Sequence, residues 1–162
     1  MTEHERLIDN LNREINGQPW HGPSLASILE GVDAGAAARR PPGGGHTIWE
    51  IVLHMTGWKR EVTRRVRGGA AAEPAGGDWP AAGEPTEARW QEARAAHVRA
   101  HDELVETIRG LGPDQLTARV AGDSAASIGA GLSVAATLWG LVQHDVYHAG
   151  QIALLKKIGR SR

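Results

Sequence analysis

Two histidines four positions apart, His144 and His148, are the strongest indication of chemistry in this sequence. They lie in the stretch QHDVYHAGQ at 143–151, inside a long apolar segment that we expect to be helical. At about 100° per residue, helix positions four apart share one face and lie roughly one turn from each other. Two imidazoles placed in this way can bind one metal ion.

A third histidine, His54, lies in an earlier apolar segment, IVLHMTGW at 51–58. Taken alone, His54 would be interpreted as a hydrogen-bonded core residue. Beside the other pair it supplies a third nitrogen from a second helix and leaves a coordination position open, which is typical of a catalytic metal site. Polar neighbours that could orient the imidazoles surround the pair: Gln143, Asp145, Tyr147 and Gln151.

His97 and His101 form a rival pair with the same spacing. Arg94 and Arg99 lie close to them in the sequence, and arginines oppose a divalent cation. We interpret this pair as core-edge or interface residues. The remaining histidines are expected in loops or in solvent: His4, His21 and His46.

The composition narrows the possible functions. The chain has 162 residues and a net charge of -1, which argues against nucleic acid or an anionic membrane surface as a partner. It has no cysteine, so disulfides, thiolate ligands and a cysteine nucleophile are excluded. The N-terminus is polar and no apolar run reaches the ~18 residues of a membrane span. We expect a soluble, cytoplasmic protein forming a single domain over residues 1–162.

The elements that would position these histidines are four long helices. Apolar residues recur with helical spacing over about 3–16, 48–67, 86–111 and 132–158, and a shorter helix is expected from Ser24. Thr47 and Glu50 have the spacing of a capping box at the start of the second helix. Loops are predicted at 39–45, 68–85 and 117–131. Four amphipathic helices without a strand pattern predict an all-α four-helix bundle.

The chain resembles the DinB/YfiT-like superfamily of metalloenzymes. Four stretches carry the likeness, in the family's order: WHGPSL at 20–25, HTIWEIVLH at 46–54, WP at 79–80 with TEARW at 86–90, and QHDVYHAGQI at 143–152. The last is the most specific, because H-D-x-Y-H-x-G-Q is much longer than a bare pair of histidines.

The resemblance implies a bundle with up-down-down-up topology and a metal bound by His54, His144 and His148. Members of this family bind Zn²⁺, Ni²⁺ or similar ions and are often dimers, so we expect a homodimer. Some transfer low-molecular-weight thiols such as bacillithiol, mycothiol or glutathione, and others isomerise a thiol adduct.

Our leading hypothesis is a divalent-metal-dependent enzyme that activates a thiol for transfer to a small electrophile. Zn²⁺ or Ni²⁺ is expected, with Fe²⁺, Mn²⁺ and Co²⁺ as alternatives. The other hypotheses are a metal-dependent hydrolase and a non-catalytic, metal-stabilised dimeric binding protein. Residues that could orient the ligands or act as acid and base are Glu50, Asp145, Tyr147 and Gln151, and pocket candidates are Trp20, Trp58 and Leu141.

Overall fold

The computed structural model describes residues 1–122 and 128–160, and all the regular structure in this part of the chain is helical. The helices are α1 (Glu3–Asn16), α2 (Leu25–Leu29), α3 (Ala34–Ala38), α4 (Ile48–Val66), α5 (Glu87–Arg109), a 3-10 helix η1 (Pro113–Leu116) and α6 (Val134–Arg160). Among these residues the only β pairing is an isolated bridge between Arg119 and Ser133. The predicted all-α class is therefore confirmed.

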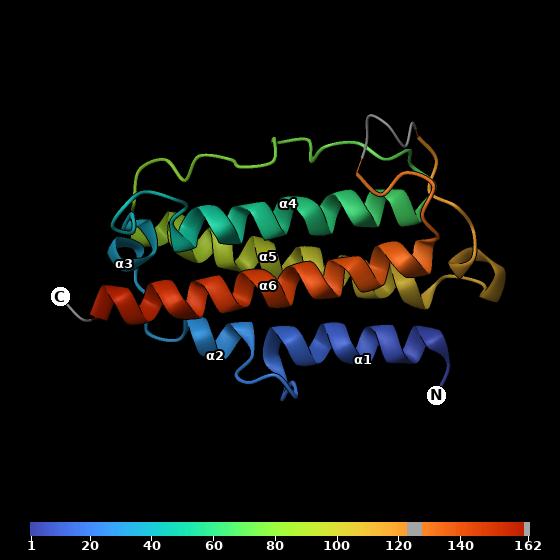
Figure 1. The fold of residues 1–162 in the computed structure, drawn as a ribbon, viewed down its shortest axis with the longest axis horizontal. Helices are drawn as coiled ribbons and strands as arrows, with labels where there is room; N and C mark the ends of the chain where they lie inside the picture. The colour runs from blue at the N-terminus through green and yellow to red at the C-terminus, as the bar shows by residue number, and fades with distance from the viewer. Residues whose placement is uncertain (123–127, 161–162) are drawn as a thin grey trace.

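The four long helices pack lengthwise into a bundle (Figure 1). α4 contacts both α5 and α6, and α1 contacts the same two helices from the other side. The long segment between α4 and α5 runs over α4, along the edge of the bundle opposite α1 (Figure 1). This segment and the α4–α6 contact position the candidate site.

The helix boundaries follow local capping chemistry. At the start of α4, the Thr47 side chain accepts from the Glu50 amide and the Glu50 side chain accepts from the Thr47 amide, so the predicted capping box is confirmed. Ser24 is the N-cap residue of α2, but its hydroxyl pairs with the Ser27 hydroxyl and not with a backbone amide. The helix predicted from Ser24 therefore begins there without the expected cap.

Two short elements were not predicted. α3 has the sequence AGAAA, which carries no apolar periodicity, and it is held by tertiary contacts with α4 and α5. The η1 turn follows Gly112 and has a proline in its first turn, a position that suits proline because its missing amide hydrogen is not needed there. Of the predicted 117–131 loop, residues 123–127 lie outside the described residues.

The apolar core is divided into two clusters along the bundle axis. One surrounds Trp49 and Trp90, which are fully buried, and the other surrounds Leu7, Leu104 and Leu138. Burial of each such side chain contributes roughly 1.5–3 kcal/mol relative to exposure. Between the clusters lies a buried polar layer, to which each long helix contributes: Glu14, Lys59, His97, His101 and Asp145. The histidines of the candidate site adjoin this layer.

Candidate metal centre

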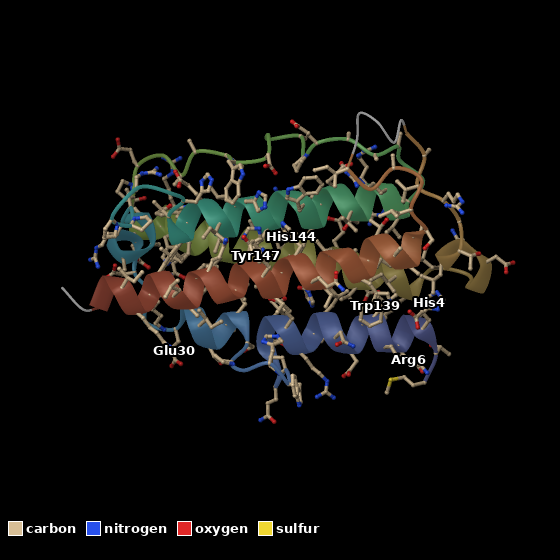
Figure 2. All side chains as sticks on the ribbon, in the orientation of Figure 1. His4, Arg6, Glu30, Trp139, His144 and Tyr147 are labelled. Atoms are coloured by element: carbon tan, nitrogen blue, oxygen red, sulfur yellow. The ribbon has the colours of Figure 1, made fainter. Side chains whose placement is uncertain are left out.

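His54, His144 and His148 come together between α4 and α6. One ring nitrogen of each lies within 4.8 Å of the others, and the Nε2 atoms of His54 and His144 are 2.9 Å apart. His54 and His148 are buried and His144 is half-buried. Figure 2 shows His144 on α6 near the middle of the bundle, with Tyr147 about one turn further along. The pair identified from its spacing, His144 and His148, and the third histidine proposed from a second helix, His54, thus form one group.

The other ring nitrogen of each histidine has an oxygen partner. His54 Nδ1 lies 2.7 Å from the Asp78 carbonyl oxygen, and His148 Nδ1 lies 2.7 Å from Gln151 Oε1. His144 Nδ1 is 3.4 Å from Asp145 Oδ1, a longer contact. Because a carbonyl or carboxylate oxygen only accepts, these partners favour the tautomers that carry the proton on Nδ1 and leave a lone pair on Nε2.

Burial favours the neutral, metal-binding form of His54 and His148. Burial lowers the pKa of His148 to about 4, although the Gln151 hydrogen bond opposes the shift. Burial is also the main cause of the lowered pKa of His54, against the effect of the Asp78 carbonyl. Neutral imidazole is the ligand and protonated imidazole is not, so His148 remains a competent ligand well into mild acid, and the lowered pKa of His54 acts in the same direction.

The arrangement fits a divalent cation. A tetrahedral ion at ~2.0–2.1 Å from each nitrogen separates the nitrogens by roughly 3.3–3.4 Å, which lies between the 2.9 Å of the His54–His144 pair and the 4.8 Å limit of the group. The short approach of His54 Nε2 to His144 Nε2 requires either one proton between them or a cation, because two lone pairs repel. No fourth histidine or carboxylate from residues 1–122 and 128–160 joins the group.

A buried ion pair lies behind His144. Asp145 and Lys59 are both completely buried and are bonded to each other. Burial alone would raise the pKa of Asp145, but the Lys59 ammonium beside it lowers that pKa to about 2. Asp145 therefore stays ionised and faces His144 with one oxygen and Lys59 with the other. The Asp145 carboxylate is therefore suited to orienting His144 and not to exchanging protons with a substrate.

Trp79 covers the group from the segment between α4 and α5. Its ring stacks on the His54 ring with centroids 3.9 Å apart, and on the His46 ring at 3.5 Å. The preceding residue, Asp78, accepts a hydrogen bond from Trp58 Nε1 at 2.7 Å. The segment is thus fixed to α4 by two successive residues and restricts water access to the histidines.

An apolar pocket of about 380 Å³ opens beside His54 and His144. Two of the predicted pocket residues, Trp58 and Leu141, line it. Trp20 does not: its side chain is fully exposed and belongs to a separate surface hollow beside α1. Glu50 caps α4 and pairs with Arg40, and it does not line this pocket.

The rival pair is buried inside the bundle. Thr56 donates its hydroxyl hydrogen to the Val52 carbonyl, so His97 Nδ1 donates to Thr56 Oγ1 at 3.0 Å. His101 Nε2 pairs with Asn12 Oδ1 at 2.9 Å. Within the described part of the chain, these two histidines do not join a metal-binding group. The prediction of core-edge or interface residues is corrected: both lie in the centre of one chain.

Several site residues were missed from the sequence. Asp78 was missed, because its contact with His54 spans 24 positions of a segment rich in Gly, Ala and Pro that carries no pattern predicting it. Trp79 belongs to the WP stretch of the family likeness, but its stacking on His54 was not predicted. Lys59 could have been found, because it follows Met55 by four positions and precedes Val62 by three on the apolar stripe of α4. A lysine there needs a buried anion.

Comparison with known proteins agrees with this architecture. Searches of curated proteins and of solved structures found no significant match to the chain. None of the helices among the described residues is long and apolar enough to cross a membrane. A family model, that of the DinB superfamily, matches residues 20–152, which include all three histidines of the candidate centre. On this match over most of its length, the chain belongs to the DinB superfamily.

Proposed function

We propose that this protein is a divalent-metal-dependent enzyme that transfers a low-molecular-weight thiol to a small electrophile. The observation that carries the proposal is the convergence of three histidine nitrogens at the wall of an apolar pocket. Because the chain has no cysteine, a sulfur nucleophile has to arrive as a second substrate.

His54, His144 and His148 would hold the ion, and three imidazoles without a thiolate suit Zn²⁺ or Ni²⁺. The ion would supply Lewis acidity, which lowers the pKa of a thiol or a water molecule near it. The chain's own contribution is to hold the imidazoles in place, through the Asp78 carbonyl and Gln151, and to limit solvent with Trp79.

The number of protein ligands favours an enzyme's metal centre over a closed structural site. A structural zinc is usually enclosed by four protein ligands. Here the described residues provide three, and the group borders a pocket. A coordination position facing a pocket is what a substrate needs.

The test measures conjugation of a small thiol to a halogenated or epoxide substrate by the metal-loaded protein. Activity should disappear with a chelator, return when Zn²⁺ or Ni²⁺ is added, and be lost in His144→Ala. His21→Ala is the matched control, because His21 is exposed and lies outside the group. A metal-loaded protein that leaves every thiol and electrophile at the uncatalysed rate would refute the transferase. Hydrolysis of esters or amides instead would assign the centre to a hydrolase.

A further inference from the structure

The three histidines separate two pockets in the groove between α4 and α6. The first, which we call the Leu141 pocket, extends along α6 from His144 towards Ala136, about 12 Å at ~1.5 Å per residue. The second, the Tyr147 pocket, extends the other way from His148 to Leu155 and has a volume of about 370 Å³. The two pockets share no lining residue. The candidate metal centre therefore lies between two spaces, each large enough for a small molecule.

The Leu141 pocket suits an uncharged apolar molecule. Apart from His54 and His144, its ionisable lining groups are Arg65 and Asp78. The Arg65 guanidinium is paired with Glu61 and donates to two backbone carbonyls, and Asp78 accepts from Trp58. The Arg65 charge is already paired and the Asp78 carboxylate is already hydrogen-bonded, so an ionic ligand finds no free partner in these two groups, whereas an apolar one contacts Trp58 and Leu141.

The Tyr147 pocket differs in chemistry. Its lining is also mainly apolar and, among the described residues, includes no aspartate, glutamate, lysine or arginine, but besides Trp79 and His148 it carries three hydrogen-bonding side chains: His46, Tyr147 and Gln151. Tyr147 and His46 are exposed, so their polar atoms are accessible to a ligand. Such a wall suits a neutral molecule that combines apolar groups with a few hydrogen-bonding ones, as a cysteinyl amide does.

We propose that the two pockets bind two different reactants at once: an uncharged apolar halide in the Leu141 pocket and a polar thiol in the Tyr147 pocket. This inference rests on the proposed thiol transfer. The thiolate sulfur, coming from the His148 side, uses a lone pair to form the S–C bond. The carbon–halogen bond breaks, the halide leaves with the bonding pair, and the thiol proton passes to solvent. Because both reactants are held beside one centre, the reaction between them does not depend on a chance encounter in solution.

The test uses ¹H–¹⁵N NMR on the zinc-loaded protein with two unreactive partners, naphthalene and N-acetylcysteine methylamide. Naphthalene should shift the amides of Gly129 and Gly140, which line the Leu141 pocket. The thiol should shift the Gly45 amide and the Gln151 side-chain amide, which line the other pocket. Each set of shifts should persist when the second probe is added.

Gly140→Leu tests the first assignment. A Cβ atom built at Gly140 meets nothing within 4 Å, so the variant narrows the Leu141 pocket without a clash in the helix. It should weaken naphthalene binding about tenfold or more and leave the thiol shifts unchanged. The matched control is Gly150→Leu, on the same helix, exposed and equally unobstructed, at a position that lines neither pocket.

The possible outcomes distinguish a failure of the two-pocket arrangement from a failure of the proposed thiol transfer. Competition of the two probes for the same amides, or equal naphthalene binding by Gly140→Leu and Gly150→Leu, would overturn the two-pocket arrangement even if conjugation is observed. Independent binding together with metal-dependent conjugation supports both. Independent binding without conjugation of any halide would overturn the transfer and the reactant roles assigned to the pockets.

Discussion

Replacing Lys59 with methionine tests the buried polar layer behind the candidate metal centre. Lys59 and Asp145 are completely buried and neutralise each other. Lys59→Met keeps a side chain of similar length but leaves the Asp145 carboxylate without its cation. Removal of one partner of a buried ion pair costs about 3–5 kcal/mol, because the remaining charge stays desolvated.

This loss is large compared with the total stability of a domain, about 5–15 kcal/mol. It would be measured by urea unfolding at about pH 8, followed by circular dichroism, with a chelator present so that metal binding does not contribute. For a slope of ~2 kcal/mol per molar urea, the midpoint should fall by roughly 1.5–2.5 M.

The loss should also depend on pH, with a definite sign. In the wild type, burial would raise the pKa of Asp145, but Lys59 holds it at about 2. Without Lys59, burial dominates and the folded-state pKa rises above the ordinary value of 3.8. A carboxyl group whose pKa is higher in the folded state than in the unfolded state contributes its full stability at pH values below the unfolded-state pKa. This contribution is lost as the pH rises through the folded-state pKa. The difference in unfolding free energy between Lys59→Met and wild type should therefore become smaller as the pH is lowered.

Two further variants serve as controls. Lys59→Met/Asp145→Leu removes both charges of the pair. At about pH 6 the neighbouring buried Glu14, whose pKa burial raises to about 7, is protonated, and there the double variant should be within about 1 kcal/mol of wild type or exceed it. Arg99→Met breaks an ion pair with Glu92 in which both side chains are exposed, and should cost less than about 1 kcal/mol. The reasoning is refuted if Lys59→Met costs no more than Arg99→Met, or if the double variant is as unstable as the single one.

Four other outcomes are expected. Metal analysis should find no stoichiometric ion in His54→Ala, His144→Ala or His148→Ala, whereas His97→Ala and His101→Ala should keep it; retention of metal by any of the first three would remove that residue from the ligand set. Burial lowers the pKa of His101 to about 4, so the stability contributed by the neutral ring is lost as pH falls from 6.5 to that value. In His101→Asn the dependence of unfolding free energy on pH in this window should be smaller by ~1.4 kcal/mol per pH unit, and an unchanged slope would contradict the buried neutral ring. Trp90→Phe should lose about 1–3 kcal/mol in thermal unfolding, because the buried Val32 carbonyl loses the indole N–H that lies 2.7 Å away; an unaltered midpoint would show that this bond contributes nothing. Light scattering should give twice the 17.3 kDa chain mass, and a monomer across micromolar concentrations would exclude the predicted homodimer.

His97 and His101 do not contribute to the predicted homodimer, although an interface position was one of the two predicted for them. Both are buried against α1 and α4 of the same chain, where His101 pairs with Asn12 and His97 with Thr56. The homodimer therefore remains a prediction, without support from these residues.

Helical periodicity was sufficient to predict the class of fold and the three histidines. The four long helices begin and end within about two residues of their predicted bounds, because apolar spacing and caps act over one or two turns of chain. The spacing of His144 and His148 is of the same local kind, since residues four apart on a helix are neighbours whatever the rest of the chain does.

The surroundings of the histidines depended on the path of the chain. Asp78 and Trp79 contact His54 only because the 67–86 segment runs back over α4 (Figure 1). Lys59 and Asp145 are 86 positions apart and meet only when α4 packs on α6. Trp20 was expected at the pocket and lies in solvent for the same reason. Periodicity shows which face of a helix is buried, but the partner of that face is selected by packing of the whole bundle, which is not encoded in any one local pattern.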